Sequence, residues 1–91
     1  MLKTIQDILF NTLSKQKGKH ASIKSSYIFK KIKNGNHKPS AYILHTLLEE
    51  VIETNKKINI NGKTWVFKRK IRKRTPRGQI RYHIYIFTQE K

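Results

Sequence analysis

Two runs of alternating side chains around one tight turn constrain this fold more than any other feature of the sequence. The runs Thr64 to Arg74 and Gln79 to Thr88 place aromatic and β-branched residues at alternate positions, which is typical of β-strands. Between them, Thr75-Pro76-Arg77-Gly78 has proline and glycine at the positions that a type I turn favours. The sequence therefore predicts an antiparallel hairpin over about 64–88.

Pairing around this turn predicts a register. The expected partners are Phe67 with Ile86, Ile71 with Tyr82, and Lys73 with Ile80. In the first strand, Trp65, Phe67 and Ile71 share a face opposite Lys68, Lys70, Arg72 and Arg74. In the second strand, Ile80, Tyr82, Ile84 and Ile86 share the expected apolar face, and Tyr85 and Phe87 lie on the other face. The hairpin should then be apolar at its base and lose that character towards its tip.

The half of the chain before the hairpin has apolar residues at helical spacing, which predicts helices over about 2–16, 25–33 and 39–55. The apolar positions are Leu2, Ile5, Leu9 and Leu13 in the first helix, Tyr27, Ile28, Phe29 and Ile32 in the second, and Ala41, Leu44, Leu47, Leu48, Val51 and Ile52 in the third. Ser25 or Ser26 is the expected N-cap of the second helix, and Pro39 suits the first turn of the third. Ile58 and Ile60, before Asn61-Gly62, predict a short edge strand.

The charge is strongly positive and unevenly distributed. The 91 residues include 21 Lys and Arg against five Asp and Glu, for a net charge of +16. No acid stands between Thr54 and Gln89, and all five arginines fall between positions 69 and 81. A charge of this size repels itself, so it indicates a polyanionic partner. The guanidinium group, unlike lysine, offers a planar fork that fits phosphate and guanine.

Other classes of function find little support. The four histidines lack metal-ligand spacing and no glycine-rich phosphate loop is present, so we expect no enzyme activity, cofactor or metal. There is no cysteine, no run of apolar residues that could cross a membrane and no secretory segment. These features predict a single intracellular, cytoplasmic domain over residues 1–91 without a membrane role.

The order of the predicted elements resembles the winged helix-turn-helix family. Ser25 to Ile32 would be the first helix of the motif, Asn34-Gly35-Asn36-His37 its turn, residues 39–55 its second helix, and Trp65 to Phe87 the wing. The resemblance implies an α+β winged helix, with three helices followed by a long basic β-hairpin wing. It also implies a double-stranded DNA-binding protein, for example a small transcriptional regulator or an architectural protein. The family often dimerises, which leaves a homodimer open.

In a helix-turn-helix, the N-terminal residues of the second helix lead into the major groove. With Leu44 at the centre of the buried stripe, Tyr42, Thr46, Glu49 and Glu53 face outward. The candidate groove readers are Lys38, Ser40, Tyr42, His45 and Thr46. The candidate wing contacts are Lys68, Lys70, Arg72, Lys73, Arg74, Arg77 and Arg81. The glutamates would repel phosphates, so we expect only the first two turns to approach DNA and the glutamates to pair with Lys56, Lys57 or a lysine of another helix.

Three alternatives remain open at this level. The third helix could be an ordinary amphipathic helix, and the hairpin could dock on an acidic protein. An RNA-binding or ribosome-associated protein would use the same charge, and its tyrosines could stack on unpaired bases. The RNA hypothesis gains if Tyr85 and Phe87 are both exposed beside Arg81.

Overall fold

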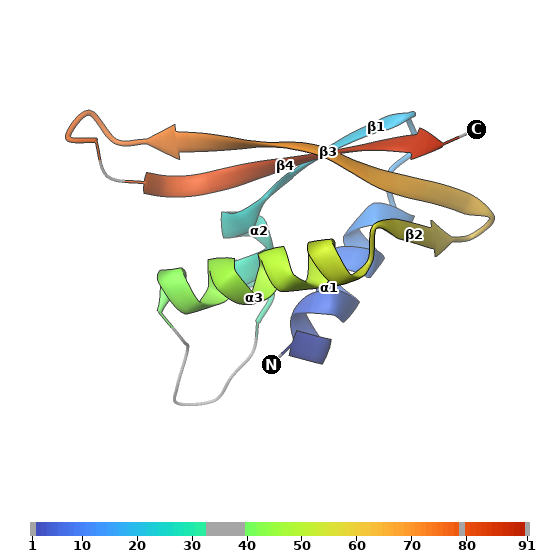
Figure 1. The fold of residues 1–91 in the computed structure, drawn as a ribbon, viewed down its shortest axis with the longest axis horizontal. Coiled ribbons are helices and arrows are strands. Elements are labelled where there is room, and N and C mark those ends of the chain that lie inside the picture. Colours follow the sequence, from blue (N-terminus) through green and yellow to red (C-terminus); the bar gives the residue numbers. More distant parts are fainter. Residues whose placement is uncertain (1, 33–39, 79, 91) are drawn as a thin grey trace.

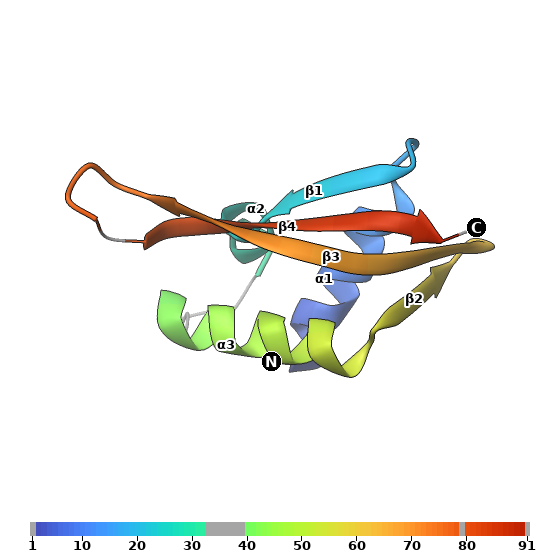
Figure 2. The same cartoon turned by 45° about the horizontal axis from the view of Figure 1, so that its top comes forward.

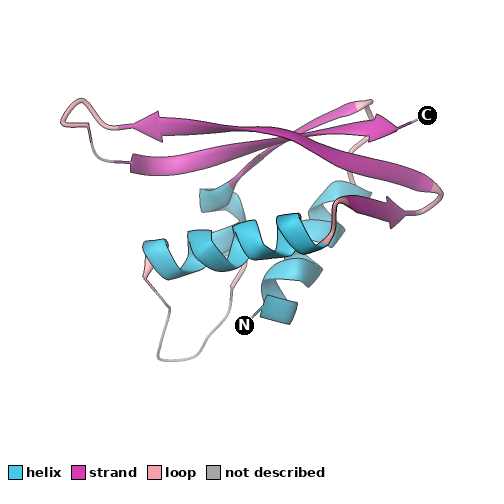
Figure 3. Cartoon of the chain, viewed as in Figure 1, coloured by secondary structure: helices cyan, strands magenta, loops and turns pink. Residues whose placement is uncertain are grey.

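The computed structural model describes residues 2–32, 40–78 and 80–90. In these residues, three helices lie on one side of a four-stranded antiparallel sheet (Figures 1 and 3). The helices are α1 (Leu2–Ser14), α2 (Ser25–Lys30) and α3 (Ala41–Thr54), and the strands are β1 (His20–Lys24), β2 (Lys57–Ile60), β3 (Lys63–Arg74) and β4 (Ile80–Glu90). The expected α+β class is confirmed. The expected turn over Asn34 to His37 lies outside the described residues, as do Lys38 and Pro39.

The helices are shorter than their sequence patterns predict. Helix α1 buries Ile5, Leu9 and Leu13 on one stripe, while Leu2 keeps 39% of its surface exposed. Helix α2 ends at Lys30, because the N–H of Lys31 bonds to the Ile28 carbonyl three residues back. Such a tightened last turn is a common way to close a helix. Tyr27 was expected on the apolar face but is 44% exposed.

The predicted edge strand is confirmed as β2, which pairs with β3 at one edge of the sheet. The turn between them is Asn61-Gly62, with φ angles of 52° and 77°. Two positive φ values are typical of a type I′ hairpin turn, which favours Asn-Gly. The short segment after α1 forms β1, the strand at the other edge, and it pairs with β4. The order across the sheet is therefore β1-β4-β3-β2.

The predicted hairpin and its turn are confirmed, but the predicted register is wrong. Phe67 lies opposite Phe87, Ile71 opposite Ile84 and Lys73 opposite Tyr82. A register shift between Phe67 and Arg69 leaves one extra residue in β3, which is the geometry of a β-bulge. After the bulge the alternation of β3 is inverted. Ile71 therefore leaves the face of Phe67, and Lys70 and Arg72 take its place on the side of the helices.

The covered face of β4 is also the opposite of the predicted one. Tyr85 and Phe87 are 1% and 0% exposed and pack in the core, whereas Ile84 and Ile86 lie on the other face and are partly exposed. Figure 1 shows the helices gathered beneath the sheet, so that among the described residues no helix covers its other face. The core joins the apolar stripes of α1 and α3 to the base of the hairpin, where Trp65 is 1% exposed as expected.

Candidate nucleic-acid interface

The end of the β3–β4 hairpin that carries the turn extends past the helices (Figure 1). We call residues 73–82 of the hairpin the arm. None of the arm side chains for which the structure describes burial is buried. At its tip, the N–H of Gly78 donates to the Thr75 carbonyl at 2.9 Å, and Arg74 Nη1 donates to the Gly78 carbonyl at 3.0 Å. The arm is thus a hydrogen-bonded hairpin that presents cations to solvent.

The arm and the strand residues beside it carry exposed, uncompensated charge. The exposed cations of the hairpin that were predicted as wing contacts are Lys68, Arg72, Lys73, Arg74, Arg77 and Arg81. Where the structure describes the chain, the ion pairs join Lys57 to Glu90, and Lys70 and His83 to Glu49. None of these pairs involves an arginine. The positive field of the arm is therefore available to an anion from outside the chain.

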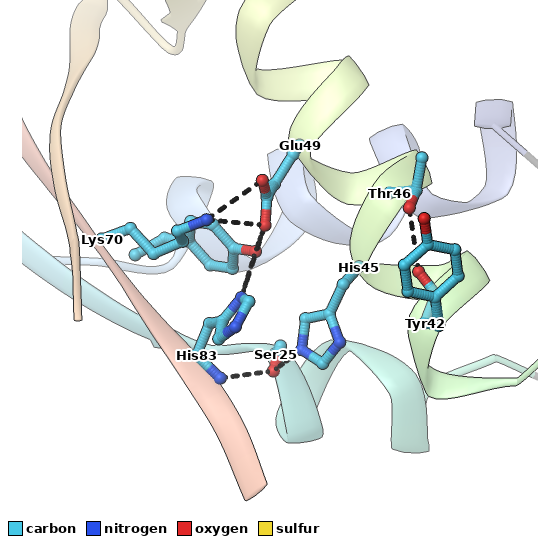
Figure 4. Close-up of polar contacts among 8 residues, drawn as sticks. Ser25, Tyr42, His45, Thr46, Glu49, Lys70 and His83 are labelled. Atoms are coloured by element: carbon cyan, nitrogen blue, oxygen red, sulfur yellow. Dashed lines mark hydrogen bonds and ion pairs between the residues drawn. The ribbon is translucent and has the colours of Figure 1, made fainter. Parts of the chain in front are cut away.

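The first two turns of α3 (residues 41–47) present a small polar and apolar surface. Ser40 is the N-cap, and its hydroxyl accepts a hydrogen bond from the Ile43 N–H at 3.4 Å. Tyr42 is 81% exposed, and Thr46 Oγ1 donates to the Tyr42 carbonyl at 3.0 Å (Figure 4). Because its proton is engaged, the Thr46 oxygen offers a ligand an acceptor. Ile43 is 48% exposed and was missed by sequence reasoning, although its helical angle from Leu44 places it near Thr46.

Two of the predicted contacts, His45 and Lys70, point towards the interior. His45 Nε2 lies 2.8 Å from the buried Ser25 Oγ, and its ring packs on Phe29 and His83. Lys70 Nζ lies 3.1 Å from both carboxylate oxygens of Glu49. Both side chains lie between α3 and the sheet. Lys70 points inward because the bulge in β3 inverts the alternation of that strand. We therefore remove His45 and Lys70 from the candidate surface.

Together these residues form what we call the polar network, whose members are Ser25, His45, Glu49, Lys70, His83 and Tyr85 (Figure 4). Ser25 is not the predicted cap of α2, whose N-cap is Lys24. Its hydroxyl oxygen instead accepts the His83 backbone N–H at 3.0 Å, so its proton can be donated to His45. A buried polar group placed in this way is satisfied by hydrogen bonds rather than exposed as a cap.

Glu49 is the charged centre of the network, and the prediction that it faces outward is wrong. The Tyr85 hydroxyl donates to Glu49 Oε2 at 3.0 Å, and His83 Nδ1 lies 3.4 Å from the same oxygen. The partner lysine is Lys70 of β3, not Lys56 or Lys57. Helix α3 is therefore held against the hairpin by a carboxylate whose charge is paired with Lys70.

The network shifts three pKa values. Burial raises the pKa of Glu49, but hydrogen bonds from Lys70 and Tyr85 outweigh it and hold that pKa below its usual value. Burial lowers the pKa of His83, and the electrostatic effects of His45 and Lys70 lower it further against the opposite effect of Glu49. Burial, followed by the negative charge of Glu49, raises the pKa of Tyr85. At neutral pH the network therefore contains an ionised Glu49, a neutral His83 and an intact Tyr85 hydroxyl.

The hydrogen bonds also assign the tautomer of His83. Its Nδ1 lies 3.1 Å from the Tyr85 oxygen, whose own proton is donated to Glu49, so Nδ1 must be the donor. His83 Nε2 then carries a lone pair, and this buried atom has no hydrogen-bond partner among the described residues. Protonation of Nε2 would bury a donor with nothing to accept it, which gives a structural reason for the lowered pKa.

No known family, curated protein or solved structure matches the chain. Over residues 2–32, 40–78 and 80–90, no helix is long and apolar enough to cross a membrane. Within the same ranges, no group of three or more His, Asp or Glu side chains is arranged to hold a metal ion. The interface must therefore be judged by its own geometry.

Proposed function

We propose that this protein binds duplex DNA as a winged helix and acts as a small transcriptional regulator or architectural protein. The first two turns of α3 enter the major groove. The arm follows the phosphate backbone or enters the adjacent minor groove. The base-edge contacts come from Tyr42, Thr46 and the exposed Ile43, because an apolar side chain can touch a thymine methyl and a hydroxyl can bond to either base type.

The observation that carries this proposal is the arm. The arm projects as a two-stranded ribbon, and none of its side chains whose burial is described is buried. Its exposed arginines form no ion pair with a carboxylate of the described chain. These side chains therefore contribute little to the stability of the fold. A phosphate backbone offers such a ribbon regularly spaced anions, and arginine binds them with paired hydrogen bonds.

The placement of α3 supports the same proposal. Its N-terminal end and the arm extend towards the same end of the molecule, on the left in Figures 1 and 2. The first two turns contain no acid, since Glu49, Glu50 and Glu53 all follow residue 47. Glu49 is turned inward to Lys70, so Glu50 and Glu53 are the carboxylates left on the outer side of the helix.

Exposure of both Tyr85 and Phe87 would have favoured the RNA alternative. Tyr85 and Phe87 are both buried, so neither can stack on an unpaired base. The exposed Tyr42 lies on α3, where a groove reader is expected. A titration of the protein with duplex DNA, single-stranded DNA and duplex RNA at one fixed salt concentration tests the DNA and RNA alternatives together.

The decisive experiment neutralises the arm. We expect wild-type protein to bind duplex DNA through about five to seven phosphate contacts, with a log–log salt slope of roughly −4.5 to −6. Changing Arg72, Arg74 and Arg77 together to Gln should weaken binding on every duplex sequence and reduce the magnitude of the slope by about 2.7. The fold should persist because these side chains are exposed.

The matched control removes the same charge elsewhere. Lys3, Lys56 and Lys63 are exposed and lie outside the hairpin arm, so the triple change to Gln should leave most of the slope intact. Equal effects of the two triple variants would mean that only net charge matters. An arm variant that binds duplex DNA like wild type would refute the proposal. If the wild-type protein binds duplex RNA or single strands more tightly than duplex DNA, that nucleic acid is its ligand instead.

A further inference from the structure

Strand β4 is apolar on both faces, although the helices cover only one of them. Tyr85 and Phe87 face the helices, whereas Tyr82, Ile84 and Ile86 face the other way and are partly exposed. An antiparallel sheet with one face in water usually alternates apolar and polar residues, and strands that are apolar on both faces are typical of sheets covered on both. The composition of β4 therefore indicates a second covering layer.

The apolar surface continues onto the neighbouring strand. Residues directly opposite each other in an antiparallel pair share a face, and Ile71 lies opposite Ile84 and Val66 opposite Thr88. We call the resulting row the outer stripe: Val66, Ile71, Tyr82, Ile84 and Ile86. All five side chains are partly exposed, and the helices of the described chain lie on the other side of the sheet (Figure 1).

Exposed cations lie on the same face as the outer stripe. Lys24 of β1 lies opposite Ile84, and Arg69 of β3 lies opposite Ile86, between Val66 and Ile71 along its strand; both are exposed. Lys24 Nζ lies 5.6 Å from the centre of the Tyr82 ring. In the described part of the chain, the carboxylate on this side is Glu90, at the far end of β4, where it already pairs with Lys57. A partner for this surface must therefore combine an apolar row with acidic flanks.

We infer that the outer stripe docks an acidic amphipathic helix of another protein. A second copy of this chain carries the same exposed cations on this face and a net charge of +16, so it does not supply acidic flanks. Unpaired bases stack mainly on aromatic rings, and the stripe has four aliphatic side chains and a single ring. The inference does not depend on the proposed DNA binding, because Lys24, Arg69 and every residue of the outer stripe except Tyr82, which belongs to the arm, lie outside the residues assigned to DNA.

The test uses a synthetic helical peptide with leucines on one stripe and glutamates on both flanks, titrated into isotope-labelled protein. We expect amide shifts in β1, β3 and β4 around the stripe. Changing Ile84 and Ile86 together to Thr, which keeps strand propensity, should weaken peptide binding by about tenfold or more, since each change removes apolar surface from the contact. Changing Lys24 and Arg69 to Gln should slow association and reduce its salt dependence.

Two controls keep these results interpretable. A peptide with the same leucines but lysine flanks should not bind. The Ile84/Ile86 variant should keep its circular dichroism and its affinity for duplex DNA, which shows that it is folded. The inference is overturned if the glutamate peptide does not bind, if its shifts are confined to the tip of the arm over residues 74–78, or if the Ile84/Ile86 variant binds it like wild type. It is also overturned if the double variant abolishes a wild-type dimer, or binding to single-stranded oligonucleotides or anionic vesicles, because the stripe would then serve that ligand instead.

Discussion

Replacing Glu49 by glutamine should destabilise the fold, because three groups of the polar network depend on its charge. Lys70 and Tyr85 donate to the carboxylate, and His83 lies 3.4 Å from it. Glutamine keeps the volume and one acceptor oxygen, so the Tyr85 bond can survive while the ionic contact to Lys70 is lost. Hydrogen bonds to charged groups contribute about 1.5–3 kcal/mol, and since the Glu49 side chain is still 40% exposed we expect a loss of about 1–2 kcal/mol.

Thermal unfolding measures this loss directly. In a domain of this size, 1–2 kcal/mol lowers Tm by about 4–16 °C. Glu50→Gln is the matched control, because Glu50 is the next residue of α3, is exposed and forms no ion pair among the described residues. Its effect should stay within about 0.5 kcal/mol. If the two variants melt together, Glu49 does not hold α3 against the hairpin and the reasoning fails.

Three further outcomes are expected. Trp65→Ala should cost about 3–5 kcal/mol because the ring is 1% exposed; a folded variant of normal Tm with weakened nucleic-acid binding would show that the ring is a ligand platform. Stability should fall as the pH drops below 6.5, the ordinary pKa of histidine, because folding lowers the pKa of His83 and the unfolded chain therefore takes up the proton first. The pKa of Glu49 is also lowered in the folded state, so protonation of Glu49 adds a further loss of stability at still lower pH. Melting followed from neutral to acid pH, with His83→Gln as comparison, checks this, and a wild-type Tm that is flat down to about pH 5 would contradict it. Thr46→Ala or Tyr42→Ala should reduce preference for a specific duplex more than affinity for random duplex, because base contacts specify and phosphate contacts position; equal losses would place α3 outside the groove.

The features of the fold that depend on local sequence were predicted well. The hairpin turn, the edge strand β2 and its Asn-Gly turn all follow from residues that favour one backbone conformation. The three helices follow from apolar spacing, with boundaries displaced by a few residues. The charge of the arm was evident in the same way, because exposed arginines need no tertiary partner to be recognised.

The features that depend on tertiary contacts were not predicted. Alternation alone could not show which face of β4 is covered, because Tyr85 and Phe87 compete with Ile84 and Ile86 for the core. The β3 bulge leaves no mark in the sequence pattern, so the inward turn of Lys70 was missed. The pairing of Glu49 with that lysine joins residues 21 positions apart, beyond the reach of helical spacing.

The bulge beside Lys68 also determines where the hairpin tolerates a change of length. The shift between Phe67 and Arg69 already absorbs one surplus residue, so deleting Lys68 would make the pairing regular up to the second shift, between Lys73 and Arg74, and would leave the other side chains of β3 on their present faces. A deletion between Lys70 and Lys73 would instead exchange the faces of everything from that point towards the tip. Insertions and deletions in descendants of this chain should therefore accumulate at Lys68 and spare the positions that follow it.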